Sequence, residues 1–189
     1  MKPIEVRNFI KDPSALRRFA FKQQYFRDQD HPQGGKFPGF RSDVISNIDY
    51  DLFKRISAKI LSAIPAQENS EARIDMYFQY CRKEDQPPEW VHRDKLYFDP
   101  NWVGLIYLTP NPPPNTGTAL YRLKEGDAAQ KDSEKDPPLR NNYELDYEIV
   151  NEYNKLAMYS PMQYHDSLDC FGNTIENSRF FIVFFMRLN

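Results

Sequence analysis

The 189-residue sequence contains few cysteines, histidines and glycines, and it has no long hydrophobic run. Its two cysteines, Cys81 and Cys170, form no CxxC pair, so we expect two free thiols. No apolar segment approaches the length of a membrane-spanning helix, and the first residues, MKPIEVRNFIKDP, are too charged for a signal peptide. The net charge of -2 lacks the basic excess typical of nucleic-acid binding. We therefore expect a cytoplasmic protein without a membrane or nucleic-acid partner.

The residues that are abundant are apolar and aromatic. The hydrophobic fraction of 40% with 15% aromatic residues is typical of a folded protein. The 14 Phe and 12 Tyr beside only 7 Gly favour packed strands over a loop-rich scaffold. The length fits one domain. We expect residues 1–189 to form a single domain, with a strand and helices in 1–66 and a β core in 70–189.

The N-terminal third carries the signals of one strand and two helices. Alternating apolar and polar residues predict a strand over 4–10. A helix is expected within 12–26, with Asp12 as its N-cap and Pro13 at its first position. Apolar residues at helical spacing predict a second helix over about 49–64. The segment 27–43 is rich in proline and glycine, which predicts a loop.

From about residue 71 the sequence has the pattern of short strands. Segments rich in β-branched and aromatic residues alternate with turn residues: ARIDMYFQYC, WVGLIYLTP, TALYRL, YELDYEIV, NKLAMYS and RFFIVFFMRL. A charged, proline-containing segment at about 124–142 predicts an exposed loop. Helices followed by strands indicate an α+β protein, mainly β, built as a β-sandwich or jelly roll with its helices on one outer face.

The three histidines have different settings. His31 lies in the polar segment DQDHPQGG, where we expect a solvated side chain. His92 and Asp94 are two residues apart in an extended segment, so both point to one side and Arg93 points away. His165 follows another predicted strand. Two histidines and one carboxylate with open metal positions match the ligand set of non-haem Fe(II) oxygenases.

Arg179 opens the last hydrophobic strand, after the second histidine of this set. A guanidinium binds a carboxylate through two hydrogen bonds and stays charged among aromatic side chains. Arg179 is therefore predicted to hold an acid inside the β core. The alternative is an arginine at a strand edge in solvent.

In the order of its motifs the chain resembles the Fe(II)- and 2-oxoglutarate-dependent dioxygenases. These motifs are the HxD pair, a strand ending in YLTP, the GTALYR strand, the distal histidine and the strand-opening arginine. They are most like the prolyl 4-hydroxylase-like branch with its small bacterial and viral members. The resemblance covers roughly residues 70–189, and FPGFRSD adds a weaker similarity. It implies a double-stranded β-helix, a jelly-roll or cupin-like barrel with helices on its major sheet.

The resemblance also implies a reaction. It would be the hydroxylation of a peptidyl residue such as proline, or of a small molecule, coupled to conversion of 2-oxoglutarate to succinate and CO2. His92, Asp94 and His165 would be the Fe(II) ligands, while Arg179 and Tyr107 would hold the distal carboxylate of 2-oxoglutarate. Tyr80 is a candidate for its other end. For both tyrosines core packing is the alternative. O2 is the second co-substrate, and ascorbate is a further candidate cofactor.

Two other readings stay open. The chain could be a non-catalytic jelly-roll binding or structural module with a vestigial metal site, or a cupin with another metal, which would not require Arg179. The gap between His165 and Arg179 is longer than in many prolyl hydroxylases and predicts an added turn before the last strand. Gly117 is expected to serve backbone geometry. The substrate, a peptide or a small molecule, and the oligomeric state stay unassigned.

Overall fold

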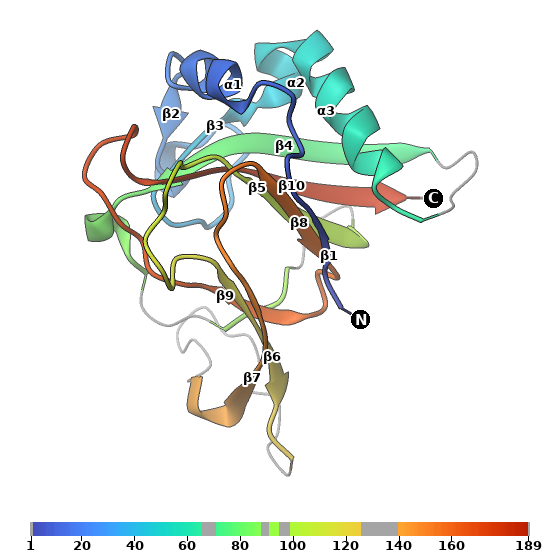
Figure 1. The fold of residues 1–189 in the computed structure, drawn as a ribbon, viewed down its shortest axis with the longest axis vertical. Coiled ribbons are helices and arrows are strands. Elements are labelled where there is room, and N and C mark those ends of the chain that lie inside the picture. The colour runs from blue at the N-terminus through green and yellow to red at the C-terminus, as the bar shows by residue number, and fades with distance from the viewer. Residues whose placement is uncertain (1, 66–70, 88–90, 95–98, 126–139, 189) are drawn as a thin grey trace.

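The computed structural model describes residues 2–65, 71–87, 91–94, 99–125 and 140–188. Within these ranges the chain folds into two antiparallel sheets (Figure 1). The larger sheet contains, in spatial order, β1 (Ile4–Val6), β8 (Lys155–Tyr159), β5 (Trp102–Tyr107), β10 (Arg179–Leu188), β4 (Ala72–Cys81), β3 (Phe40–Val44) and β2 (Tyr25–Phe26). The smaller sheet contains β7 (Tyr143–Ile149), β6 (Thr118–Leu123) and β9 (Tyr164–Ser167).

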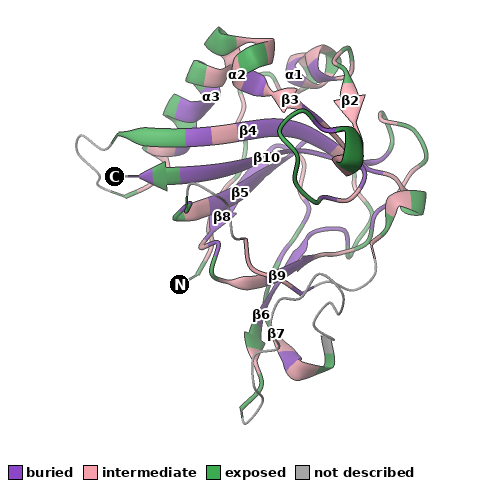
Figure 2. Cartoon of the chain, turned by 180° about the vertical axis from the view of Figure 1, so that it is seen from behind, coloured by how far each residue is buried: buried purple, intermediate pink, exposed green. Residues whose placement is uncertain are grey.

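Three helices cover the outer face of the larger sheet (Figures 1 and 2). They are α1 (Pro13–Ala20), α2 (Ile45–Ile48) and α3 (Tyr50–Ser62). Asp12 caps α1 by accepting from the Ala15 amide at 2.8 Å, and Asp49 caps α3 by accepting from the Leu52 amide at 2.8 Å. The N-cap predicted at Asp12 and the packing of the helices on one sheet are thus confirmed.

The two faces of the larger sheet differ because side chains alternate along each strand. On β4, Met76 and Phe78 join the helices in one apolar cluster. Tyr77 and Gln79 point to the opposite face, toward the smaller sheet. The same alternation along β10 places Phe180 under the helices and Phe181 inside. An interior bounded by both sheets is therefore separate from the helix-covered core.

Several element boundaries differ from the sequence prediction. The first strand ends at Val6, and Asn8 then adopts a positive φ of 53°. The first helix ends at Ala20, and Tyr25–Phe26, within the range predicted as helical, form the edge strand β2. The short helix α2 was not predicted. The predicted loop 27–43 is wrong at its end, because β3 starts at Phe40 and pairs with β4. Strand β9 was also missed, being only four residues long.

His31 is not solvated as predicted. Only 6% of the residue is exposed, and its Nε2 lies 2.8 Å from the carbonyl oxygen of Ser42. Its ring packs against the rings of Phe26, Phe37 and Tyr77. Burial lowers the pKa of His31, which favours a neutral ring among these aromatic side chains. The polar sequence around His31 suggested a solvated side chain, but the folded chain buries it.

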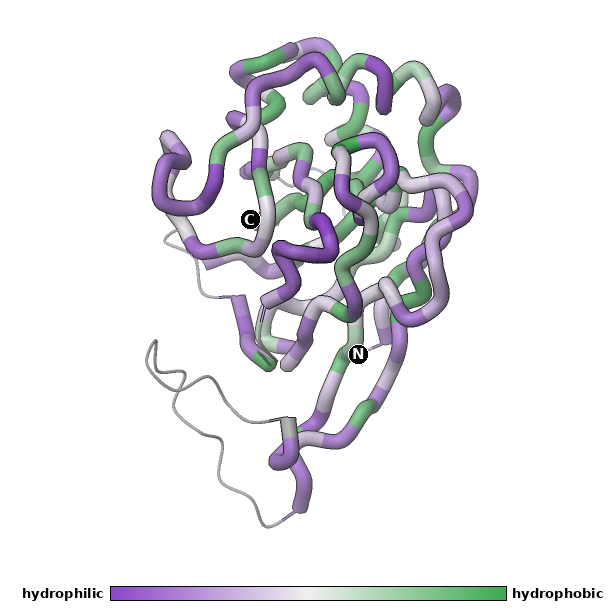
Figure 3. Tube along the Cα trace, turned by 90° about the vertical axis from the view of Figure 1, so that its left-hand side faces the viewer, coloured by the Kyte–Doolittle hydropathy of each residue, from purple (hydrophilic) through white to green (hydrophobic). Residues whose placement is uncertain are grey.

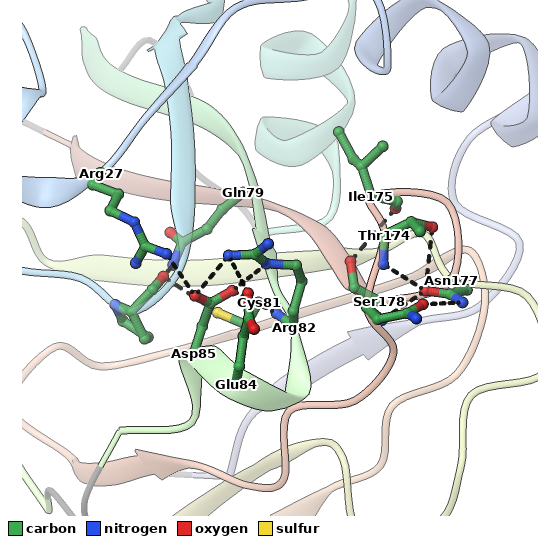
Figure 4. Close-up of polar contacts among 12 residues, drawn as sticks. Arg27, Gln79, Cys81, Arg82, Glu84, Asp85, Thr174, Ile175, Asn177 and Ser178 are labelled. Atoms are coloured by element: carbon green, nitrogen blue, oxygen red, sulfur yellow. Dashed lines mark hydrogen bonds and ion pairs between the residues drawn. The ribbon is translucent and has the colours of Figure 1, made fainter.

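Two segments flanking the sheet are held by polar contacts (Figure 4). At the end of β4, Asp85 bonds to the backbone amide and the guanidinium of Arg82. Before β10, Asn177 Oδ1 accepts from the amides of Asn173 and Thr174, both at 2.9 Å. The added turn predicted before the last strand is present in this second segment.

The hairpin of β6 and β7 projects from the rest of the protein (Figures 1 and 3). The amide of Lys124 donates to the carbonyl of Asn142 at 3.0 Å, which closes the described part of the hairpin. Most of the predicted loop 124–142 lies outside the described residues. Among the residues that are described, no helix is both long and apolar enough to cross a membrane.

Candidate metal centre

The structure brings the three predicted ligands together. Each of these residues offers one ligand atom, and the three atoms, from His92, Asp94 and His165, all lie within 4.8 Å of one another. Asp94 Oδ2 is 3.3 Å from His165 Nε2, and Asp94 Oδ1 is 3.8 Å from His92 Nε2. The two imidazole rings lie 4.3 Å apart. This spacing lets a single cation contact all three side chains.

Backbone pairing fixes the position of the triad. His92 and His165 form an antiparallel bridge, with amide-to-carbonyl distances of 3.0 and 2.9 Å. The amide of Asp94 donates to the carbonyl of Pro161 at 3.0 Å. Strand β9, which carries His165, is itself held by β6. The segment 91–94 thus runs beside β9 and presents both of its ligands to the same side.

His165 is oriented through its other ring nitrogen. Nδ1 lies 2.9 Å from the carbonyl oxygen of Gln163. A carbonyl oxygen can only accept a hydrogen bond, so Nδ1 must carry the proton. With Nδ1 protonated, the neutral ring carries its lone pair on Nε2, the atom that faces Asp94. Such a bond to the far nitrogen is the usual support of a metal-binding histidine.

Burial and charge act in opposite directions at the triad. Burial alone would raise the pKa of Asp94, but the charges of His165, His92 and Arg41 outweigh it and lower that pKa. Burial alone would lower the pKa of His165, but the Asp94 carboxylate raises it. A proton between Asp94 and His165 can therefore be replaced by a divalent cation, because the cation also favours the negatively charged form of Asp94.

The triad opens into a cavity of about 180 Å³ between the two sheets. Its wall includes apolar side chains of the larger sheet (Val103, Leu105, Phe181, Val183 and Phe185). The polar groups of the wall include the triad, Arg179, Thr118, Arg41 and Gln79. A few polar groups in a mostly apolar wall are typical of small-molecule sites.

Arg179 is buried at this cavity, with 2% of the residue exposed. Its Nε donates to the carbonyl of Thr116 at 2.7 Å, and Nη2 donates to the carbonyl of Gly117 at 2.9 Å. Nη1 forms no hydrogen bond within the part of the chain that the structure describes. A Cβ atom on Gly117 would collide with the carbonyl of Ile149, so glycine is required for this close approach.

Tyr107 supports Arg179 from behind. Its hydroxyl lies 2.8 Å from Thr118 Oγ1, which is also 3.4 Å from Arg179 Nη2. Tyr107 is fully buried, and burial raises the pKa of its hydroxyl. Thr118, and not Tyr107, lines the cavity. Tyr107 is therefore near its predicted position, but it is linked to the cavity only through its hydrogen bond to Thr118.

Tyr80 lies on the other face of the sheet from the triad. Its ring stacks on Phe40 with centroids 4.9 Å apart and packs edge-on against Tyr25 at 5.1 Å. It belongs with the residues packed against the helix-covered core. The prediction that Tyr80 contacts a co-substrate is therefore wrong, because strand alternation directs it outward and directs Gln79 into the cavity.

The sequence matches a family model described as "Family of unknown function (DUF6445)" over residues 3–163. The chain belongs to this family. The match covers the three residues His92, Asp94 and Arg41 but ends just before His165. The sequence matches no curated protein.

Solved structures that resemble this DUF6445 protein share its fold at low sequence identity. HygX from Streptomyces hygroscopicus, solved with nickel and 2-oxoglutarate bound, has a TM-score of 0.63 at 13% identity, covering 98% of this chain and 82% of HygX. A prolyl hydroxylase from Trichoplax adhaerens, in complex with a hypoxia inducible factor peptide fragment, has a TM-score of 0.59 at 11% identity, covering 98% and 83%. SnoN, a non-heme alpha ketoglutarate dependent epimerase from nogalamycin biosynthesis, has a TM-score of 0.59 at 10% identity, covering 98% and 78%.

Sequence reasoning missed three polar residues of the cavity in this DUF6445 protein: Arg41, Gln79 and Thr118. Arg41 was hidden by the loop prediction for 27–43, although the quoted motif FPGFRSD contains it. Gln79 was overlooked beside Tyr80, yet period-2 alternation on β4 would have placed these two neighbours on opposite faces. Arg93 does point away as predicted, with its guanidinium 4.7 Å from the ring of Tyr164.

Proposed function

We propose that this protein is an Fe(II)- and 2-oxoglutarate-dependent oxygenase that hydroxylates its substrate. The observation that carries the proposal is the His92, Asp94 and His165 cluster at the wall of an internal cavity that also holds a buried arginine, Arg179. The fold shared with HygX and SnoN supports the same reaction class. The two-sheet interior agrees with a double-stranded β-helix, which we propose as the finer description of the fold.

The donor set fits Fe(II). Two imidazole nitrogens and one carboxylate oxygen are the ligands of the non-haem iron oxygenases, and they leave positions open for other ligands. Gln163 orients His165, and the carboxylate of Asp94 supplies the negative charge that a divalent cation requires. Bound iron would supply the activation of O2 coupled to decarboxylation of 2-oxoglutarate, chemistry that belongs to the metal and not to side chains.

Arg179 is the proposed partner of the distal carboxylate of 2-oxoglutarate. Its backbone partners Thr116 and Gly117 hold the guanidinium in place without neutralising it. Thr118 Oγ1, beside it on the cavity wall, adds a hydroxyl for the same carboxylate. Tyr107 fixes that hydroxyl through its own hydrogen bond. The charge-assisted bonds of a guanidinium are strong where water is excluded.

The apolar wall serves to exclude water. Leu105, Phe181 and Val183 line the same cavity as Arg179 and the triad. A dry wall strengthens each polar contact inside it and limits side reactions of a bound oxidant. These residues orient and shield; the proposed reaction requires no proton transfer from them.

The direct test is 2-oxoglutarate turnover by the purified protein with Fe(II). We expect succinate to form with the wild-type protein and to fall to background with His92→Ala and with Asp94→Ala. Nickel binding, measured by titration calorimetry, should be lost in the same variants while their circular dichroism is unchanged. Undiminished succinate formation in both variants would refute the metal assignment.

The alternatives predict other results in that experiment. A vestigial binding module would bind no divalent metal at stoichiometric level and would form no succinate. A cupin that works without the co-substrate would bind metal but would be insensitive to replacement of Arg179. The peptidyl substrate expected from the prolyl hydroxylase-like resemblance and a small-molecule substrate are compared by offering both classes in the same assay.

A further inference from the structure

The cavity contains a second arginine, the partly buried Arg41, which neither the triad nor the proposed 2-oxoglutarate contacts use. It lies on β3, directly across from Gln79 of β4. Its Nε and Nη2 donate to Gln79 Oε1 at 2.9 and 2.7 Å. Gln79 in turn donates to the carbonyl of Pro38 at 2.9 Å. The guanidinium is therefore held in one orientation by a neutral amide.

Aromatic rings also pack around the guanidinium of Arg41. The guanidinium carbon lies 4.0 Å from the ring centroid of Phe37, 5.0 Å from that of Tyr77 and 6.0 Å from that of Phe185. Such contacts favour a cation and restrict its motion. They do not neutralise its charge.

Within the described part of the chain, Arg41 has no carboxylate partner in direct contact. No Asp or Glu among the described residues lies within ion-pair distance of it, and Nη1 forms no hydrogen bond with any of them. The charge of Asp94, which belongs to the metal triad, acts on Arg41 and raises its pKa. A bound divalent cation would take up the charge of Asp94 and leave Arg41 without a counter-ion among the described residues.

A desolvated cation without a counter-ion is costly. Burial lowers the pKa of Arg41 to about 10, so the guanidinium still carries its charge at neutral pH. Retaining a largely desolvated charge, which among the described residues is held by Gln79 and aromatic rings, makes physical sense if an anion completes the site during function.

That anion differs from the one assigned to Arg179. The Arg179 guanidinium lies 4.8 Å from the ring of Phe181, whereas that of Arg41 lies near Phe185. These two phenylalanines are on the same strand and the same face, and four residues of strand span about 13 Å. With the co-substrate held between Arg179 and the triad, Arg41 remains available for a second ligand.

Resting on the proposed function, we infer that Arg41 is a specificity-determining residue that binds a carboxylate group of the substrate. Nη1 and the free side of Nη2 form the edge that would receive it. The exposed Lys36, which also lines the cavity, adds positive charge on the approach. The substrate class is thus an acid, either a small free acid or an acidic side chain, that presents its carboxylate to the cavity beside the co-substrate.

The test compares acids with their uncharged amides. Each free L-amino acid and its carboxamide is added to the nickel- and 2-oxoglutarate-loaded protein, and the shift in melting temperature is measured. An N-acetylated, C-amidated peptide with one glutamate is compared with its glutamine counterpart. We expect at least one acid to stabilise the wild-type protein more than its amide does. The two arms separate a free acid from an acidic side chain.

Three variants identify Arg41 as the cause. Arg41→Met should remove the preference for the acid, and Arg41→Lys should retain part of it. Gln79→Glu leaves the arginine in place but supplies an internal carboxylate, so it should also abolish the preference even if Arg41→Met folds poorly. Arg122→Met, at an exposed ion pair with Glu144, is the matched control and should behave as wild type.

The outcomes are separable from those of the proposed function. Uncoupled succinate formation, read in the same samples, should be unchanged in the control Arg122→Met. Its absence from the wild-type protein refutes the oxygenase proposal itself. If succinate forms but no acid outperforms its amide, or if the preference survives in both Arg41→Met and Gln79→Glu, the inference about Arg41 is overturned.

Discussion

The two faces of the larger sheet differ in what they bury. The outer face, under α1 and α3, buries apolar side chains such as Met76, Phe78 and Phe184. The inner face of the same strands carries the buried Arg179 and Gln79 and the partly buried Arg41. Apolar burial stabilises the fold, whereas burial of an unneutralised charge costs free energy. The outer face therefore stabilises the sheet, and the inner face is where we propose that ligands bind.

The strongest test of this contrast removes a charge from the inner face. Asp94→Ala should lower divalent metal affinity below detection by calorimetry and reduce succinate formation to background. It should leave the apo protein folded, because the carboxylate packs against histidines and not against the apolar core. A variant that retained metal binding would contradict the division between the faces.

On the outer face the largest effect is expected from Phe78→Ala. Phe78 is fully buried between the rings of Phe19 and Phe180. Its truncation should lower the free energy of unfolding by about 3–5 kcal/mol. Urea denaturation measures this loss, and metal affinity of the folded protein should stay within about twofold of wild type. A loss of metal binding without a loss of stability would reverse the assignment.

A smaller effect on the inner face is expected from Arg179→Met. Loss of a charged hydrogen-bonding group costs about 1.5–3 kcal/mol, which corresponds to a roughly ten- to hundredfold higher 2-oxoglutarate requirement. Metal affinity without 2-oxoglutarate should be unchanged. An unaltered KM for 2-oxoglutarate would remove Arg179 from the co-substrate site.

The smallest effect is expected at a residue on neither buried face. Arg122 pairs with Glu144 at 2.9 Å in a largely exposed setting on the β6 and β7 hairpin. Arg122→Ala should change the free energy of unfolding by less than about 1 kcal/mol and leave turnover unchanged. A larger change in turnover would show that the hairpin takes part in the site.

Much of the candidate site could be predicted because its residues are marked by short patterns in the sequence. The HxD spacing is fixed by strand geometry, so His92 and Asp94 were found without a structure, and Arg179 was marked by its place at the start of an apolar strand. The long strands β4 and β10 were predicted at their observed bounds, because ten residues of apolar and aromatic sequence leave little ambiguity.

What escaped prediction depends on tertiary pairing. Strand β3 lies within a segment rich in glycine and proline, and only its register with β4 makes it a strand. Arg41 on that strand therefore looked like a loop residue. His31 looked solvated because its aromatic neighbours Phe37 and Tyr77 come together only in the folded chain. Tyr80 was assigned to the wrong face because the alternation of side chains along β4 was not applied to it.

The position of β10 in the sheet has a consequence for folding. This strand lies between β4 and β5, yet it follows both of them in the chain by many residues. During synthesis the two flanking strands emerge long before the strand that joins them, and each has an unpaired edge until then. Such non-local closure is slow and leaves partly folded chains prone to aggregation. Release of β10 from the ribosome, and not formation of the helices, should therefore limit how fast the cavity first assembles.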